Sequence, residues 1–283
     1  MTCRQIRERL HCAGIENADG EALLLASFVT GRSTAELRMA YDEPICDPTG
    51  RLESLIDLRA RRYPLQYLMG TWGFWRQEYE VSPDCLIPRA DTEVLLEYAA
   101  THLPQGARVL DLCTGSGCIA ISLLCERQDV SAVAVELYEN TLAIAKRNAV
   151  RNGVGDDRLG FLQGDVLTGD FLSSLGRFDA ILSNPPYIPT AQLSRLAPEL
   201  AFEPSAALDG GEDGLLFYRR MLKDDYRAAL KMSGFYLFEI GYDQGEALCA
   251  LAHERGDECR IVRDLGGQDR VAVVTPAARA EYV

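Results

Sequence analysis

The sequence contains no apolar run long enough to cross a membrane. A membrane-spanning helix needs about 18 or more consecutive apolar residues, and polar or charged residues interrupt every apolar stretch of these 283 residues before that length. Residues 1–10 also lack the apolar core of a signal peptide, because they include three arginines and a glutamate. Internal repeats and low-complexity tracts are absent too. We therefore expect a cytoplasmic globular protein that does not bind membranes.

The nine cysteines lack the spacing of a zinc site or of a disulfide framework. Their number is odd, and no two of them form a Cys-x-x-Cys pair. We therefore expect free thiols in a reducing compartment, and no bound metal. The nine positions are Cys3, Cys12, Cys46, Cys85, Cys113, Cys118, Cys125, Cys249 and Cys259.

Basic residues are outnumbered by acidic ones, at 29 Lys and Arg against 42 Asp and Glu, and the net charge is −13. Residues 1–70 are close to neutral, with 9 basic and 10 acidic residues, so almost all of the excess negative charge lies in the rest of the chain. An acidic surface repels a phosphate backbone. Direct binding of nucleic acid is therefore not expected.

The composition is otherwise that of a globular protein with room for one large and one small domain, at 47% hydrophobic and 25% charged residues. Within residues 1–62, apolar side chains recur at helical spacing between glycine-containing breaks, which predicts a small helical bundle. We expect this N-terminal domain to span residues 1–70. It contains no cofactor or acid–base motif, so we interpret it as a substrate-recognition domain. A β-hairpin linker is expected at residues 71–88.

The remaining residues, 89–283, alternate between strand-like apolar runs and helical segments. This alternation is typical of a doubly wound α/β fold with a parallel sheet. A short link at 264–269 joins the last two strands and favours an antiparallel last strand. Strands are predicted near residues 109–113, 132–136, 159–164, 179–184, 235–240, 259–263 and 271–275, and helices near 90–102, 117–126, 138–152, 192–197, 214–232 and 243–255.

A glycine turn follows the first of these strands, which ends near Asp111. Gly115 and Gly117 allow the backbone to approach a ligand closely, and the helix that begins near Cys118 points its N-terminus toward that ligand. Glu136 ends the next strand, 19 residues beyond Gly117. A carboxylate at about this spacing binds ribose hydroxyls in nucleotide-binding βαβ units. The combination predicts a site for a cofactor that contains a nucleoside.

The tetrapeptide Asn184-Pro185-Pro186-Tyr187 directly follows the apolar run at 178–183. Proline has no backbone N–H and a fixed φ, so this loop is stiff and its carbonyl groups are free to accept hydrogen bonds. Asn184 adds a side-chain oxygen, and Tyr187 adds a flat ring with a polar tip. Such a cluster suits a planar amine or amide whose N–H groups must be held. Taken alone, the same residues are also compatible with a simple turn.

Together these motifs resemble the class I S-adenosylmethionine-dependent methyltransferases, and more specifically the release-factor glutamine methyltransferases. Two departures from the family pattern stand out: Cys113 replaces a glycine that is usual in the cofactor loop, and Glu136 replaces a frequent aspartate. The similarity covers seven segments in order, at residues 64–75, 86–93, 111–121, 178–188, 203–215, 238–245 and 264–271.

The resemblance implies a Rossmann-like, seven-stranded sheet whose last strand is antiparallel. It also implies methyl transfer from S-adenosylmethionine to the side-chain nitrogen (N5) of glutamine in the Gly-Gly-Gln motif of peptide-chain release factors, with S-adenosylhomocysteine as the product. Asn184, Pro185 and Tyr187 are the expected catalytic residues, and Pro186 is a further substrate contact. Arg89, Glu203 and Glu239 lie in matched segments and either shape the site or form structural hydrogen bonds.

The cofactor residues follow from the same resemblance. The loop at 113–117 is expected to hold the methionine part, Glu136 the ribose, and Asp165 with Val166 the adenine. The full expected set is Asp111, Cys113, Thr114, Gly115, Ser116, Gly117, Glu136, Asp165, Val166 and Asn184.

Three alternatives stay open at this point. Asn-Pro-Pro-Tyr also serves N6-adenine methyltransferases of DNA or RNA, since an exocyclic amine poses the same problem, although the acidic charge argues against them. A glutamine methyltransferase of a ribosomal protein shares the motif, although residues 64–93 favour release factors. A non-enzymatic cofactor-binding module is the third.

For the oligomeric state, we expect a monomer.

Overall fold

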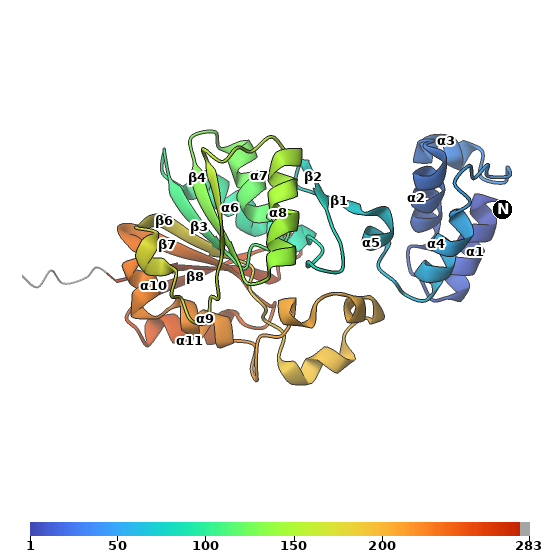
Figure 1. Ribbon diagram of the computed structural model, residues 1–283. Helices are drawn as coiled ribbons and strands as arrows, with labels where there is room; N and C mark the ends of the chain where they lie inside the picture. Colours follow the sequence, from blue (N-terminus) through green and yellow to red (C-terminus); the bar gives the residue numbers. More distant parts are fainter. Residues whose placement is uncertain (278–283) are drawn as a thin grey trace, which may run out of the picture. The chain divides into compact units, whose positions relative to one another are not determined.

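The computed structural model describes residues 1–277, which form two compact units (Figure 1). One unit comprises residues 1–71 together with 197–202, and the other comprises residues 72–196 and 203 onward. Within the described residues, no helix has both the length and the apolar character needed to span a membrane.

The first unit is a bundle of short helices, as predicted. Its core is apolar and includes Ile6, Leu10, Leu25 and Ile56. Thr2 and Ser33 begin α1 and α3 with capping boxes, in which side chain and backbone satisfy each other's hydrogen bonds. The helices are α1 (Cys3–Cys12), α2 (Ala18–Thr30), α3 (Thr34–Met39), α4 (Leu52–Ala60) and α5 (Leu65–Met69).

Residues 197–202 belong to this unit although they are distant in sequence. Glu199 accepts hydrogen bonds from Arg59 Nη1 at 3.0 Å and Arg62 Nη2 at 3.1 Å. Arg59 is only 5% exposed and also binds Glu21 at 2.5 Å. The ring of Phe202 lies edge-on to Tyr63, with centroids 5.1 Å apart. Nothing in the sequence pattern of residues 197–202 indicated this placement.

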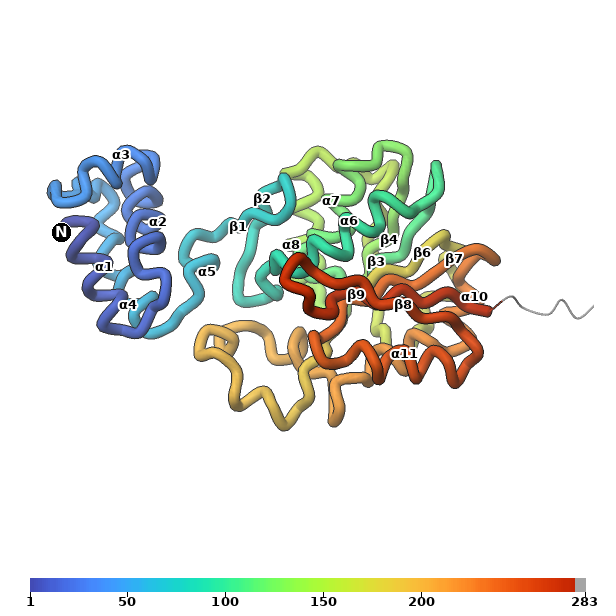
Figure 2. Tube along the Cα trace, turned by 180° about the vertical axis from the view of Figure 1, so that it is seen from behind, coloured from blue at the N-terminus to red at the C-terminus, as the bar shows by residue number. Residues whose placement is uncertain are grey.

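The second unit is built on a seven-stranded sheet of order β5-β4-β3-β6-β7-β9-β8. Strands β3 to β7 are parallel, and β9 runs antiparallel to both neighbours, β7 and β8. Figure 2 shows β8 and β9 side by side. The predicted doubly wound sheet with an antiparallel last strand is thereby confirmed. The strands are β3 (Arg108–Leu112), β4 (Ser131–Glu136), β5 (Leu159–Gln163), β6 (Phe178–Ser183), β7 (Leu230–Glu239), β8 (Glu258–Arg263) and β9 (Asp269–Thr275).

Helices cover both faces of the sheet, because alternate strand residues point to opposite sides. Val109 packs with α6 and α7 in one apolar cluster, whereas its neighbour Leu110 packs with α9 and α11 in the other. The helices of this unit are α6 (Glu93–His102), α7 (Cys118–Glu126), α8 (Glu139–Arg151), α9 (Leu216–Met221), α10 (Asp224–Ala228) and α11 (Gly245–His253). A two-stranded hairpin, β1 (Thr71–Phe74) and β2 (Gln77–Glu80), precedes them at the place expected for the linker.

The single helix predicted at 214–232 is wrong. Two short helices, α9 and α10, occupy its first part, and β7 already begins at Leu230. Leu230 pairs with Phe178 of β6. The end of this apolar segment is therefore stabilised more by hydrogen bonds to the sheet than by continuing a helix. The helix expected at 192–197 is a 3-10 helix at Thr190–Arg195, and a 3-10 turn at Ala90–Thr92 precedes α6.

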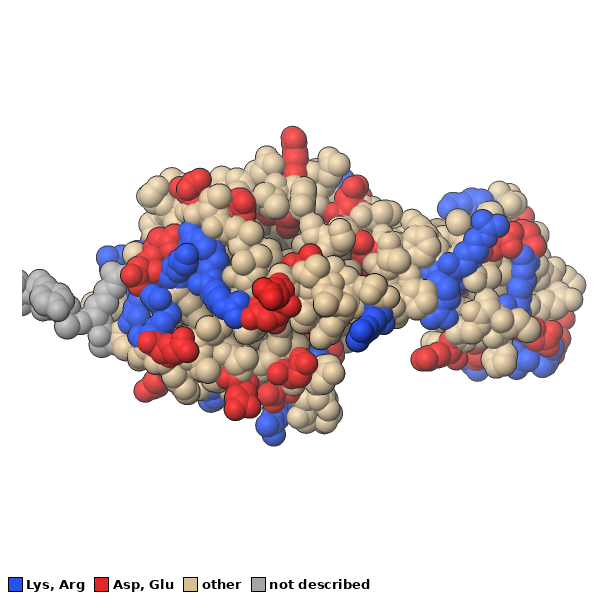
Figure 3. All heavy atoms as spheres, turned by 90° about the horizontal axis from the view of Figure 1, so that it is seen from below, with Lys and Arg blue, Asp and Glu red and all other residues tan. Residues whose placement is uncertain are grey.

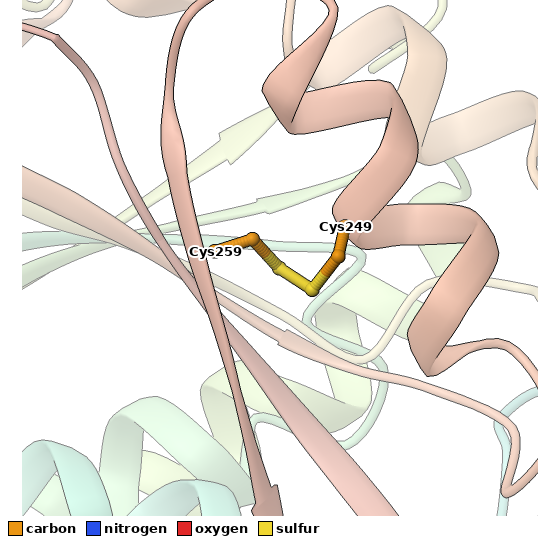
Figure 4. Close-up of a disulfide and its surroundings, with 2 residues drawn as sticks. All are labelled: Cys249 and Cys259. Atoms are coloured by element: carbon orange, nitrogen blue, oxygen red, sulfur yellow. A yellow bond between two sulfur atoms is a disulfide. The ribbon is translucent and has the colours of Figure 1, made fainter.

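The expectation of free thiols is wrong for two cysteines. Cys249 on α11 and Cys259 on β8 form a disulfide, with their Cα atoms 5.2 Å apart (Figure 4). The chain turns back between α11 and β8, and this brings two residues ten positions apart within bonding reach. Free thiols are found at Cys3, Cys12, Cys46, Cys113, Cys118 and Cys125.

Candidate active site

The loop between β3 and α7 forms one wall of a pocket at the carboxyl ends of the strands. Its backbone is left-handed at three residues, Cys113 (φ 58°), Gly115 (φ 57°) and Gly117 (φ 82°). A Cβ atom on Gly117 would lie 2.7 Å from Ile121 Cδ1 and 3.3 Å from Ala145 Cβ, so any larger residue there would be strained and would have to displace a neighbour. Glycine at this position therefore lets α7 and α8 pack closely beneath the loop.

Asp111 supports this loop from behind. Its carboxylate is fully buried and accepts a hydrogen bond from Thr114 Oγ1 at 2.6 Å. The other carboxylate oxygen, Oδ1, has no partner. Burial raises the pKa of Asp111 to about 7, because the charged form is poorly solvated there. Thr114 lines the pocket, whereas Asp111 does not.

Glu136 ends β4 and is 8% exposed. Its Oε2 accepts from the backbone N–H of Gly115 at 3.0 Å, and its Oε1 accepts from those of Leu137 at 2.9 Å and Tyr138 at 3.3 Å. Burial raises the pKa of this carboxyl, while the three N–H donors lower it. A carboxylate has about four lone-pair sites, so one is still available to a ligand hydroxyl.

The pocket has an empty volume of about 920 Å³, including the part that is open to solvent. The structure brings together most of the predicted cofactor residues in its wall: Cys113, Thr114, Gly115, Ser116, Glu136, Asp165, Val166 and Asn184, joined by Pro186. Four predicted residues do not line it: Asp111, Gly117, Pro185 and Tyr187.

Several lining residues were not predicted as site residues, namely Thr92, Leu137, Tyr138, Thr141, Ala207 and Phe217. For Thr92 and Ala207 a signal existed, because they lie in the segments 86–93 and 203–215 that carry the family resemblance. Arg89 also lines the pocket, and its guanidinium binds the carboxylate of Glu203, which in turn accepts from the Ile87 N–H at 3.1 Å. Arg89 and Glu203 thus hold two loops of the wall together.

Asp165 and Val166 follow β5 and also line the pocket. Asp165 Oδ1 accepts from the Leu167 N–H at 2.7 Å, which holds the loop in a turn. The carbonyl of Val166 accepts from the Tyr226 hydroxyl at 2.8 Å, and the Val166 side chain is 5% exposed. These two residues offer one carboxylate and one apolar surface to a ligand.

The loop after β6 carries Asn184 to Tyr187. Asn184 donates from Nδ2 to Thr92 Oγ1 at 3.1 Å, which leaves its side-chain oxygen for other partners. The Tyr187 carbonyl accepts from Gln244 Nε2 at 2.9 Å. Gly210 and Gly214 pack so closely against Tyr187 that an added Cβ would lie 2.7 Å and 2.3 Å from its backbone. The loop is therefore held on both sides as well as stiffened by its two prolines.

On the face drawn in Figure 3, Lys and Arg form separate groups interspersed with Asp and Glu. Among residues 1–277, no cluster of three or more His, Cys, Asp or Glu side chains is arranged to hold a metal ion.

Comparison with known proteins identifies the family to which the chain is similar. Residues 2–70 match the PrmC N-terminal domain, and residues 90–230 match the methyltransferase small domain. A release factor glutamine methyltransferase from Geobacter sulfurreducens is 39% identical over 91% of this chain and 89% of its own length. Another, from Xylella fastidiosa, is 40% identical over 92% of this chain and 93% of its own length.

A solved methyltransferase from Pyrococcus furiosus shares the fold, with a TM-score of 0.52 and 18% identity over 70% of this chain and 87% of that one. The sheet order, the glycine loop and the extent of the sequence matches agree with one another. The chain belongs to the family of release factor glutamine methyltransferases.

Proposed function

We propose that this protein transfers a methyl group from S-adenosylmethionine to the side-chain nitrogen of the glutamine in the Gly-Gly-Gln motif of peptide-chain release factors. One observation carries the proposal: Asn184 lines the cofactor pocket with its NH₂ group already bonded to Thr92, so that its oxygen is available to a substrate amide. The proposal includes our expectation of a cytoplasmic monomer that acts on a protein and not on nucleic acid.

The residues of the pocket fit the cofactor. Gly115 in the left-handed loop at 113–117 has no side chain to block the close approach of a ligand, and Glu136 keeps an acceptor site for a ribose hydroxyl. Asp165 and Val166 offer a hydrogen-bond acceptor and an apolar surface to the adenine. When bound, S-adenosylmethionine supplies a methyl group on a sulfonium, and sulfur keeps the electron pair when the bond to that methyl breaks.

The task of this chain is to prepare the nucleophile. An amide nitrogen shares its lone pair with the adjacent carbonyl, so it attacks poorly in the planar form. Asn184 Oδ1 and the Pro185 carbonyl accept the two N–H bonds of the glutamine and aim the nitrogen lone pair at the methyl carbon. Fixed acceptors also stabilise the positive charge that develops on nitrogen. The new N–C bond forms, and one N–H proton then passes to water.

Orientation of this kind contributes up to roughly 7–11 kcal/mol in ideal cases. Tyr187 anchors the loop, because its backbone carbonyl accepts a hydrogen bond from Gln244 Nε2. Burial raises the pKa of the Tyr187 hydroxyl, so it stays neutral at physiological pH. No strong base is required, since the proton leaves after the nitrogen has been alkylated.

The test is methyl transfer from labelled S-adenosylmethionine, with purified release factor, ribosomal proteins and DNA offered in parallel. We expect one methyl on the Gly-Gly-Gln glutamine, located by peptide mass spectrometry. Asn184→Ala should lower kcat by about 100-fold or more, since removal of one preorganised hydrogen-bonding group costs about that much in comparable sites. Asn140→Ala, on the exposed face of α8, is the matched control and should leave kcat unchanged.

Other outcomes would contradict the proposal. Label on DNA would favour the adenine methyltransferase, and label on a ribosomal protein would favour the second glutamine substrate. A protein that binds S-adenosylmethionine but modifies none of the three acceptors would reject the proposal as it stands.

A further inference from the structure

Asn148 of α8 is a fully buried polar residue that contacts the cofactor loop at 113–117. Its Oδ1 accepts a hydrogen bond from the backbone N–H of Glu80 at 2.6 Å, and its Nδ2 donates to the Glu80 carbonyl at 3.1 Å. Nδ2 also donates to the Ser116 carbonyl at 2.9 Å. One side chain therefore joins helix α8, strand β2 and the cofactor loop.

The two ends of the Asn148 carboxamide cannot exchange places. Glu80 presents both an N–H and a carbonyl to it, and the carboxamide pairs with both, as a neighbouring strand would. A rotated carboxamide would bring its oxygen against the carbonyls of Glu80 and Ser116. An amide NH₂ group has two hydrogens to donate, and both are used on these two carbonyls. Strand β2 thus fixes the direction of the bond to Ser116.

On the side of the loop, this bond holds one peptide plane. The Ser116 carbonyl and the Gly117 N–H belong to the same planar trans peptide unit and point in opposite directions. Asn148 holds the carbonyl, and the Gly117 N–H donates to the Thr114 carbonyl at 2.8 Å, which closes the turn. The peptide unit is therefore fixed at both of its polar ends, and the conformation of the turn is fixed with it.

The same loop carries groups that meet the cofactor in the proposed function. Thr114, Gly115 and Ser116 line the pocket, and the Gly115 N–H donates to Glu136 Oε2 at 3.0 Å. A displacement at Ser116 would therefore move a wall of the pocket and disturb the contact with Glu136.

We propose that Asn148 is a positioning residue for S-adenosylmethionine, which holds the cofactor loop in its binding conformation by tying the Ser116 carbonyl to strand β2. This inference rests on the cofactor site of the proposed function. Asn148 acts through the loop, since the loop residues and not Asn148 line the pocket.

Asn152, one turn further along the chain from Asn148, offers a matched comparison. Its Nδ2 donates to the Glu78 carbonyl of β2 at 3.0 Å and to the Asn148 carbonyl at 2.9 Å. Asn152 therefore also attaches this part of the chain to the hairpin, whereas its side-chain bonds within residues 1–277 do not reach the cofactor loop. A difference between the two asparagines separates the bond to Ser116 from the docking of the hairpin.

The experiment measures the affinity of the full-length protein for S-adenosylhomocysteine by isothermal titration calorimetry, at about pH 8, where an aspartate is ionised. Aspartate keeps the shape of asparagine but has no NH₂ group, so it cannot donate to the two carbonyls. We expect Asn148→Asp to weaken the affinity by about tenfold to hundredfold, in line with the loss of buried hydrogen bonds, and Asn152→Asp to weaken it by less than about threefold.

Two further measurements separate positioning from general destabilisation. Urea unfolding gives the folded fraction of each variant, and a protein that is about nine-tenths folded loses only about 1.1-fold in apparent affinity. At saturating S-adenosylmethionine, kcat of Asn148→Asp on release factor should stay within about threefold of wild type, because the loss concerns binding of the cofactor and not the chemical step.

Several outcomes would overturn the inference. These are an unchanged affinity in Asn148→Asp, an equal loss in Asn148→Asp and Asn152→Asp, and a kcat at saturating cofactor that falls as far as the affinity does. If the affinities differ as expected but wild type methylates no release factor, the proposed substrate fails and the inference stands. If wild type does not bind S-adenosylhomocysteine, both fail.

A measurement on the wild-type protein decides the question if Asn148→Asp does not fold. In NMR spectra, addition of S-adenosylhomocysteine should shift the side-chain NH₂ signals of Asn148 more than those of Asn152, because Asn148 is bonded to the loop that meets the cofactor. Shifts of equal size, or no shift at Asn148, would overturn the inference.

Discussion

Two buried carboxyl groups at the site, Asp111 and Glu239, have pKa values raised to about 7. For both, burial is the largest cause, because the charged form is poorly solvated inside the protein. Asp111 also holds the cofactor loop, because its carboxylate accepts a hydrogen bond from Thr114.

Most single residues of the site could be predicted because their chemistry is local. The glycine turn, the acidic residue at a strand end and the Asn-Pro-Pro-Tyr segment can each be recognised from a few consecutive residues. Phe217 could not be found in this way, since its position in the pocket depends on how distant segments meet. The same is true of Asp111, whose type suggested a ligand contact although it supports the loop from behind.

Among the elements, the loop between β3 and α7 depends on a close contact at Gly117. An alanine there would need a left-handed backbone and would also press against Ile121 and Ala145. Gly153 has a similar φ of 70° but has no atoms within 4 Å of the place of a Cβ. We expect Gly117→Ala to lower the free energy of unfolding by about 1–3 kcal/mol more than Gly153→Ala, since overpacking adds to backbone strain.

Urea unfolding of the two variants and of wild type gives this difference directly. Because α7 begins at this loop, Gly117→Ala should also weaken binding of S-adenosylmethionine, whereas Gly153→Ala should not. Equal destabilisation by the two substitutions would mean that the loop relaxes around the added methyl group and that the contact is not tight.

The strands were predicted more accurately than the helices, for a physical reason. Buried parallel strands are continuous apolar runs that end abruptly at polar residues, as at Phe178–Ser183. The prediction of one helix at 214–232 was wrong because the apolar spacing at the end of this segment is compatible with both a helix and a strand. The pairing of Leu230 with Phe178 of β6 makes the end of the segment a strand. The disulfide between Cys249 and Cys259 was missed because it depends on the packing of α11 against β8.

At the scale of the whole molecule, the raised pKa values of Asp111 and Glu239 predict how stability changes with pH. Their usual values are 3.8 and 4.5, and both are raised to about 7 in the folded protein. Between these values the folded state binds more protons than the unfolded state. The free energy of unfolding should therefore fall as the pH rises from about 4 to 7, by up to about 1.4 kcal/mol per pH unit for each group.

Urea unfolding at several pH values, without cofactor, measures this slope. Asp111→Asn should make the slope shallower, because one of the two groups no longer titrates. Asp156→Asn, at an exposed position, should leave the slope as in wild type. A free energy of unfolding that rises with pH across this interval would contradict the raised values.

The placement of residues 197–202 has a consequence for how this protein can be taken apart and recombined. The helical unit is assembled from two stretches of chain, and the shorter one supplies the partner of Arg59 and Arg62. A cut at residue 70 would remove those arginines but leave Glu199 and Phe202 behind. An exchange of helical units between relatives would therefore have to carry the distant hexapeptide along with the first 71 residues, and selection would be expected to make the two stretches vary together.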